Sequence, residues 1–145
     1  MGEIISFRGL MADNTRDTLN LHTNNGLAGY RIKKLELFPA KFGYLDQEST
    51  VTIFKTQGNT ISSEVDFSNQ DLIAASCLSS DNAETSPLNL SSVFDGEVFN
   101  QDIEICHNDG HADANPVNYY LELEKVSLDL HQASAATLKN IRNSA

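Results

Sequence analysis

The side chains best suited to metal chemistry lie in one short stretch, which reads HNDGHADAN and ends at Asn115. His107, Asp109, His111 and Asp113 alternate along it. Imidazole nitrogen with carboxylate oxygen suits Zn²⁺ or Mn²⁺, and carboxylates with Asn115 suit Ca²⁺. The spacing matches no standard metal motif, however, and Asp, Asn and Gly are the residues that any exposed turn prefers. We interpret the stretch as a surface loop and expect no bound metal or cofactor, the four alternating residues being the weak candidates for an ion site.

Hydrolysis is the other chemistry to consider, and it needs a paired nucleophile and base or a pair of carboxylates. Glu122 and Glu124 stand two residues apart, and such side chains share one face of a strand at roughly 6–7 Å, but an exposed acidic strand gives the same pattern without catalysis. The sequence contains no G-x-S-x-G, P-loop or G-x-G-x-x-G motif. Cys77 and Cys106 each lie in an apolar run, which predicts small buried side chains rather than a disulfide or a reactive thiol. We expect no catalytic residues and no enzyme activity.

The charge distribution bears on the partners of the protein. The chain has 20 acidic and 10 basic residues and a net charge of -10, which disfavours nucleic acid as a partner. Between Thr56 and Glu124 there is no Lys or Arg. This acidic stretch forms a solvated face, or it meets a basic patch on a neighbouring copy. With no apolar run near the roughly 18 residues of a membrane span and no signal-peptide pattern, we expect synthesis in a cytoplasm and no membrane partner.

An alternation of apolar and polar residues runs along most of the chain and is typical of half-buried strands. In Gly29–Phe38 the alternation slips at Lys33-Lys34, which is what a β-bulge leaves in a sequence. Gly58-Asn59 lies between two alternating runs and is a hairpin signal. The predicted strands are Asp17–His22, Gly29–Phe38, Ser49–Lys55, Thr60–Phe67, Asp102–Cys106 and Val117–Leu128.

Two further segments complete the fold prediction. The apolar run Asp71–Leu78 is a buried strand or a short helix, which periodicity cannot separate, and the polar segment Ser79–Ser92 is a surface loop. Together the pattern predicts one all-β domain over residues 1–145, an antiparallel β-sandwich of jelly-roll-like type. In the tail, Leu130, Ser134, Leu138 and Ile141 recur at helical spacing. They predict a short amphipathic C-terminal helix over residues 130–142 that lies against the sheet or against a partner.

Two stretches carry a resemblance to a known group of proteins. Val93–Ile105 (VFDGEVFNQDIEI) and Pro116–Leu128 (PVNYYLELEKVSL), followed by a helix ending in TLKNIR, resemble the C-terminal half of small virion structural proteins of marine tailed bacteriophages. The runs GYRIKKLELFP and TVTIFK are similar in type. The resemblance implies a capsid-associated protein, namely a cement or decoration subunit bound outside a phage head. A tail component and a shell-forming subunit are the alternatives, and no catalytic residue is implied.

With this resemblance, the expected location is the virion and the expected partners are a capsid or other virion protein and further copies of the chain, for example in a trimer. Residues 1–16 start apolar and end polar, which predicts an N-terminal arm that a partner orders; alternatively, Glu3–Arg8 is the first strand of the sheet. The C-terminal helix is the second candidate contact. The predicted interface residues are Ile4, Ile5, Phe7, Leu10 and Met11 in the first segment and Leu138 and Ile141 in the helix.

A carbohydrate- or receptor-binding β-sandwich module is the rival function. Such modules stack sugars on exposed aromatic side chains, and this chain has no Trp. Tyr44, together with Phe42, is the aromatic residue that the sequence places in a loop and that we expect to be exposed.

Overall fold

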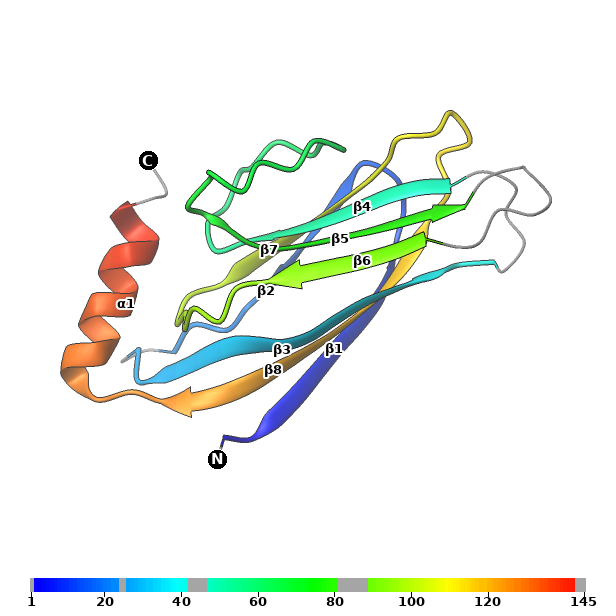
Figure 1. Ribbon diagram of the computed structural model, residues 1–145. Coiled ribbons are helices and arrows are strands. Elements are labelled where there is room, and N and C mark those ends of the chain that lie inside the picture. Colours follow the sequence, from blue (N-terminus) through cyan, green and yellow to red (C-terminus); the bar gives the residue numbers. More distant parts are fainter. Residues whose placement is uncertain (1, 24–25, 42–46, 81–88, 143–145) are drawn as a thin grey trace.

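Alternating apolar and polar residues build two antiparallel sheets that pack face to face (Figure 1). The computed structural model describes residues 2–23, 26–41, 47–80 and 89–142. Within these ranges the elements are β1 (Ile4–Met11), β2 (Thr15–Leu19), β3 (Ala28–Pro39), β4 (Gln47–Phe54), β5 (Leu72–Ser80), β6 (Asn89–Phe94), β7 (Ile103–Asp109), β8 (Val117–Ser127) and the helix α1 (Leu130–Arg142).

The strands pair in a nested order. One sheet has the order β1-β8-β3 and the other the order β2-β7-β4-β5-β6. The first strand therefore pairs with the eighth, the second with the seventh and the fourth with the fifth, as in a jelly roll. The third and sixth strands contact each other but belong to different sheets, because β6 pairs with β5. The predicted antiparallel β-sandwich is confirmed, with jelly-roll-like pairing.

The core lies between the two sheets and takes alternate residues from each strand. In β8, for example, Val117, Tyr119, Leu121 and Leu123 face inward and are buried. The predicted β-bulge is present in β3, where Ile32 is opposite Leu123 and Lys34 is opposite Glu122. The extra residue between them, Lys33, restores the apolar residues that follow to the core face.

Two expectations about the middle of the chain are wrong. Thr60–Phe67 is not a strand, because β4 already pairs with β5 on one side and with β7 on the other and offers no free edge to a following hairpin. The segment Ser79–Ser92, predicted as a surface loop, begins in β5 (Leu72–Ser80), and its described end belongs to the edge strand β6 (Asn89–Phe94). The ambiguous run Asp71–Leu78 proves to be a strand, since β5 spans Leu72–Ser80.

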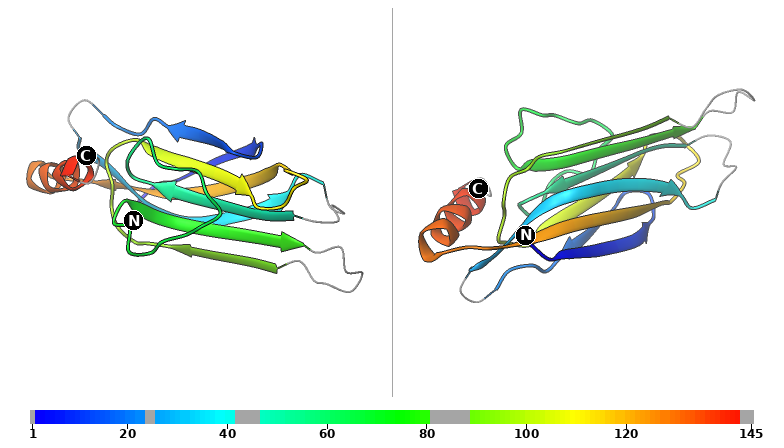
Figure 2. Two further views of the ribbon diagram at one scale, coloured as in Figure 1. Left: turned by 90° about the horizontal axis from the view of Figure 1, so that it is seen from above. Right: turned by 60° about the horizontal axis from the view of Figure 1, so that its bottom comes forward.

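The N-terminal segment is a strand and not an arm. Residues 4–11 form β1, which pairs along its whole length with β8, so the alternative prediction for Glu3–Arg8 holds. Met11 is 2 % exposed and belongs to the core, which corrects its assignment as an interface residue. β1 is an edge strand of the three-stranded sheet and lies beside β8, as the right-hand view of Figure 2 shows.

The C-terminal helix lies across one end of the sandwich (Figure 1). Asp129 and Gln132 cap its first turn by exchanging side-chain hydrogen bonds with each other's backbone N–H groups. The helix packs through Ala133 and Ala136, whereas Leu130 is exposed. The leucine face predicted to meet a sheet or a partner is therefore not the face that meets the sandwich. No helix within the described residues is long and apolar enough to cross a membrane.

The two cysteines differ in burial. Cys106 is buried, as predicted, and burial together with the nearby Glu104 raises the pKa of its thiol to about 12. Cys77 is exposed, which corrects the prediction for it. The apolar run that contains Cys77 is a strand whose residues alternate between two faces, so Leu78 is buried and its neighbour is not.

Candidate interaction surface

The outer face of the three-stranded sheet carries two exposed apolar side chains in one row. Leu10 of β1 and Phe38 of β3 are both directly opposite Asn118 of β8. Leu10 is 60 % exposed and Phe38 is 64 % exposed. Because the side chain between them is short and polar, a shallow hollow of about 580 Å³ opens along this part of the sheet. The arrangement offers an apolar rim around a polar floor.

The next row of the same face supplies an aromatic ring held in place by charged groups. Tyr120 lies between Arg8 and Glu36, its direct neighbours on β1 and β3. Its hydroxyl donates a hydrogen bond of 2.7 Å to Glu122, and the Nζ atom of Lys34 is 5.8 Å from the ring centroid. The hydrogen bond to Glu122, with burial as a smaller cause, raises the pKa of the Tyr120 hydroxyl. These contacts fix the ring as part of the hollow.

Basic residues are concentrated in the three-stranded sheet. It carries Arg8, Arg31, Lys33, Lys34 and Lys125 beside the acidic Glu36, Glu122 and Glu124, whereas the described strands of the five-stranded sheet carry Arg16 as their one Lys or Arg. Arg31 pairs with Glu124, and its hydrogen bond holds the pKa of that carboxyl below the usual value. Glu122 and Glu124, the carboxylates weighed as a catalytic pair, thus each have a partner on this face.

The outer face of the five-stranded sheet is partly covered by the chain itself. Thr52 and Phe54 face away from the core but are buried under the segment from Lys55 to Asp71. Glu104 fastens this segment, because its carboxylate accepts hydrogen bonds from the backbone N–H groups of Gly58 and Asn59. The described chain places no such cover over the hollow on the three-stranded sheet.

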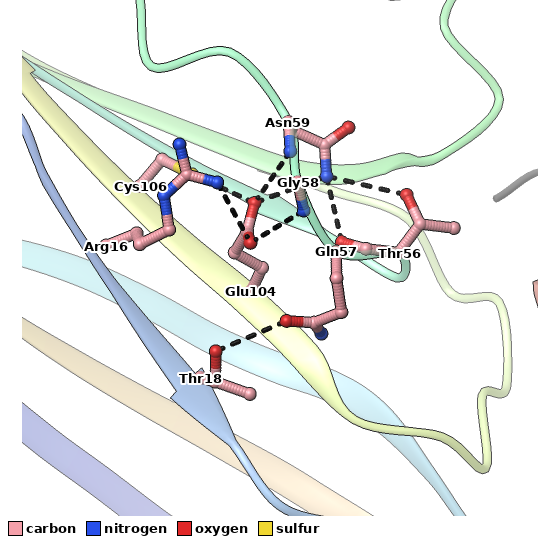
Figure 3. Close-up of polar contacts among 8 residues, drawn as sticks. All are labelled: Arg16, Thr18, Thr56, Gln57, Gly58, Asn59, Glu104 and Cys106. Atoms are coloured by element: carbon pink, nitrogen blue, oxygen red, sulfur yellow. Dashed lines mark hydrogen bonds and ion pairs between the residues drawn. The ribbon is translucent and has the colours of Figure 1, made fainter. Parts of the chain in front are cut away.

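Glu104 is 2 % exposed, and hydrogen-bond donors surround its charged carboxylate. The Arg16 guanidinium is 3.2 Å from it, on the side opposite Gly58 and Asn59 in Figure 3. Burial by itself raises the pKa of the Glu104 carboxyl, but the backbone and side-chain donors and Arg16 outweigh it and lower the pKa below its ordinary value of 4.5.

We expect Glu104→Gln to cost about 1–3 kcal/mol of unfolding free energy at pH 7, because an amide cannot satisfy N–H donors on every side. Since the folded-state pKa of Glu104 is lowered, its contribution is complete above pH 4.5 and is lost as the pH falls below that value. Urea unfolding at pH 7 and pH 3 measures this, with the exposed Glu64→Gln as control. A difference between wild type and Glu104→Gln that is the same at both pH values would contradict it.

The four candidate metal ligands do not gather in one place. His107 is fully buried, and its Nε2 atom is 3.0 Å from the Ser49 hydroxyl. Asp109 accepts hydrogen bonds from the backbone N–H groups of His111 and Asn115, so it organises the turn that follows β7. Asp113 and His111 approach each other at the surface, at 3.6 Å. Within the described residues, no group of three or more His, Cys, Asp or Glu side chains is placed to hold a metal ion.

The Ser49–His107 pair has the atoms of a nucleophile and a base, but not their setting. Ser49 is 1 % exposed and His107 is 0 % exposed, and both point into the sandwich. The Nδ1 atom of His107 is 3.0 Å from the carbonyl of Ala12. A carbonyl only accepts, so Nδ1 carries the proton and Nε2 accepts from Ser49. We interpret the pair as a structural hydrogen-bond chain.

The predicted interface residues divide into three groups. Ile4 and Leu10 are exposed on the outer face of β1, and Leu138 is exposed on α1. Ile5 and Phe7 are half-buried at the margin of the core. Ile141 belongs to α1, but its side chain lies outside the description, as do Phe42 and Tyr44 with their whole segment.

Phe38 and Tyr120 are the surface residues that sequence reasoning missed. The signal for Tyr120 was present, because the alternation in Val117–Leu128 puts it on the face opposite Tyr119. Phe38 follows Leu37, and the bulge at Lys33 decides that Leu37 faces the core and Phe38 the outer face. What the sequence did not supply is the pairing of both strands with β8, which brings the two rings to one face.

The fold and this surface define a jelly-roll-like β-sandwich, over the part of the chain described, with an open hollow between exposed apolar side chains on its smaller sheet. Comparison of the sequence with profiles of known protein families and with characterised proteins finds no match.

Proposed function

We propose that the protein is a non-enzymatic virion structural protein, a cement or decoration subunit that attaches to a phage head by protein–protein contacts. The observation that carries the proposal is the hollow between Leu10 and Phe38 on the outer face of the three-stranded sheet. An aromatic ring and an aliphatic side chain exposed together are the anchors around which protein interfaces form. The likeness of Val93–Ile105 and Pro116–Leu128 to phage virion proteins gives the class of partner.

The charges around the hollow fit a protein partner. Arg8, Lys34 and Glu36 surround Tyr120, so charges of both signs lie beside the exposed apolar side chains of Leu10 and Phe38. In such interfaces the rim sets orientation and the centre provides affinity. The net charge of -10 disfavours a position against packaged DNA.

Such a subunit would stabilise the head by binding to it, without a chemical reaction. A subunit that binds only the assembled shell shifts the equilibrium toward that shell, by an amount set by its concentration relative to its dissociation constant. Made in the host cytoplasm, the subunit would join the virion after or during head assembly. A homo-oligomer would multiply the contacts and so strengthen the attachment.

Virions produced by the genome that encodes the chain provide the test. We expect mass spectrometry of purified particles to find the protein in many copies, and antibody labelling in electron micrographs to locate it on the head. Particles from a genome with the gene deleted should release their DNA at a lower temperature and regain stability when the purified protein is added. Absence from the particle would overturn the proposal, and labelling of the tail would replace a head subunit by a tail component.

A carbohydrate-binding module is the second candidate, because the same hollow combines aromatic rings with hydrogen-bonding groups. Phe38 and Tyr120 offer ring faces, and Arg8, Asn118 and Glu36 offer polar groups beside them. A glycan array read with the purified protein separates the two functions. A glycan that binds and raises the melting temperature favours the module, and Phe38→Ser should then abolish that shift.

A further inference from the structure

The four edge strands of the two sheets differ in how they are protected against pairing with another chain. β3 contains the bulge at Lys33, ends in Pro39 and is bridged at Tyr30 by Phe99. β2 is five residues long and carries Arg16 and Asp17. β6, the opposite edge strand of the same sheet, lies against β3. Charges, prolines, bulges, shortness and cover are the devices by which natural proteins block an open edge.

Over the part of the chain that the structure describes, β1 has one of these devices, a single charge. It is eight residues long, pairs with β8 in a continuous register without a bulge, and contains no Pro or Lys. Arg8 is its one charged residue, and its side chain lies on the outer face of the sheet. The inner-face residues Ile5 and Phe7 are half-buried, so the core is incompletely covered along this edge.

The hydrogen bonding of β1 shows which backbone groups the edge presents. The N–H of Lys125 donates to the carbonyl of Glu3, its direct partner, at 2.7 Å. In an antiparallel ladder every second residue exchanges both bonds with its neighbour, so the odd-numbered residues of β1 face β8. The N–H and C=O groups of Ile4, Ser6, Arg8 and Leu10 therefore point to the open edge.

The sequence of β1 is complementary to itself in one antiparallel register. If Phe7 lies opposite Phe7 of a second copy, Ile4 falls opposite Leu10, Ser6 opposite Arg8, and Ile5 opposite Gly9. Two exposed apolar residues are then paired on the outer face. On the inner face Ile5 meets a glycine, which leaves it room. The residues whose backbone N–H and C=O groups point to the open edge then lie opposite one another in the two copies and form hydrogen-bonded pairs.

The neighbouring registers are worse. A shift by two residues in one direction places Arg8 opposite Arg8, and like charges directly opposite destabilise a pair. A shift in the other direction places Ile4 opposite Arg8 and leaves Leu10 beyond Ile4 without its apolar partner. Shifts by one residue put core-facing side chains on the outer face.

We propose that two copies of the chain pair through β1, antiparallel about a twofold axis at Phe7, and join their three-stranded sheets into one continuous sheet. The partner is a second copy of this chain, because one register both forms hydrogen bonds between the backbone groups at the two edges and places Ile4 opposite Leu10. The inference makes the self-association in the proposed function specific. It is tested on the isolated protein, whereas attachment is read from particles, so either can fail without the other.

The test removes one outward N–H from the edge. Ser6→Pro deletes a donor that β8 does not use, and proline is tolerated where the N–H side of an edge strand faces solvent. We expect light scattering coupled to gel filtration to give a dimer for wild type and Ser6→Ala, and at least a tenfold higher dissociation constant for Ser6→Pro. A wild-type monomer at every concentration, a defined trimer, or an undiminished dimer in Ser6→Pro would each overturn the pairing.

A cross-link tests the register and remains informative if Ser6→Pro does not fold. In a Cys77→Ser background, which removes the exposed thiol, Phe7→Cys places two sulfurs across the twofold axis. In this register the two copies of residue 7 form a non-hydrogen-bonded pair. The Cα atoms of such a pair are about 4.5 Å apart, within the range that a disulfide spans. Oxidation should give a covalent dimer, and Ile5→Cys in the same background should not. Covalent dimer from Ile5→Cys alone, or from neither variant, would overturn the register.

Discussion

Phe38→Ser is expected to weaken attachment to the phage head at least tenfold and to leave the fold unchanged. Phe38 is 64 % exposed, so the substitution removes little core contact. A buried aromatic anchor at the centre of an interface contributes about 2 kcal/mol or more, and a factor of ten corresponds to about 1.4 kcal/mol. Cosedimentation of labelled protein with particles from the gene-deleted genome measures the affinity, and the melting temperature reports the fold.

Phe67→Ser is the matched control. Phe67 is an equally exposed phenylalanine, 71 %, on the segment that covers the five-stranded sheet. Equal loss in both variants would mean that attachment depends on surface hydrophobicity in general and not on the hollow. Leu138→Ser addresses the remaining sequence prediction, since that residue is 65 % exposed on α1. Loss confined to Leu138→Ser would move the contact from the sheet to the helix.

The two proposals reinforce each other geometrically. A twofold axis perpendicular to a continuous sheet keeps the outer faces of both copies on the same side. The hollows that contain Phe38 would then face one surface together, with the paired Ile4 and Leu10 side chains between them. Two linked sites that bind one surface gain an effective concentration, so the dimer would attach by a factor of 10²–10⁴ more strongly than one subunit.

The regular parts of the fold were predictable from the sequence because one physical rule decides them. Period-two alternation identifies strands that bury one face in the core and expose the other to water. It predicted the bulge at Lys33 and the strands around Ile105 and Leu121. It failed for Thr60–Phe67, which alternates but has no edge to pair with. It also failed for Asn89–Phe94, whose polar residues occupy an edge strand where burial is not required.

The candidate surface was only half predictable for a related reason. Leu10 was identified because it stands in an apolar N-terminal stretch, but Met11 was grouped with it although the two residues face opposite sides of β1. Phe38 and Tyr120 required knowledge that β3 and β8 are neighbours, which is a long-range property of the topology. The sequence shows which face a side chain takes; the pairing of strands shows which side chains share it.

A different part of the molecule carries the largest expected effect on stability. Gln47, Ser49 and His107 form a chain of hydrogen bonds inside the sandwich, in which Gln47 donates to the Ser49 hydroxyl at 2.9 Å. The imidazole continues the chain to the carbonyl of Ala12, just beyond β1. Because Ala12 lies in the turn from β1 to β2, the chain connects both sheets at one end of the sandwich.

His107→Ala is expected to lower the unfolding free energy by about 2–4 kcal/mol. The substitution leaves a cavity where a fully buried ring was, and it leaves the Ser49 hydroxyl and the Ala12 carbonyl without their partner. For a domain of this size the melting temperature should fall by roughly 5–15 °C. Urea unfolding and calorimetry at pH 7 measure the two quantities.

His107→Asn separates the hydrogen bonds from the cavity. An asparagine amide nitrogen can take the place of Nδ1 and donate to Ala12, while the contact to Ser49 is lost, so this variant should unfold between wild type and His107→Ala. His131→Ala, at an exposed position of α1, should change stability by no more than about 0.5 kcal/mol. If His107→Ala were as mild as His131→Ala, the chain would not be what holds this end of the sandwich. The ordering of the three variants therefore measures how far a buried polar chain, rather than apolar packing alone, fixes β1 and β2 to the sheets.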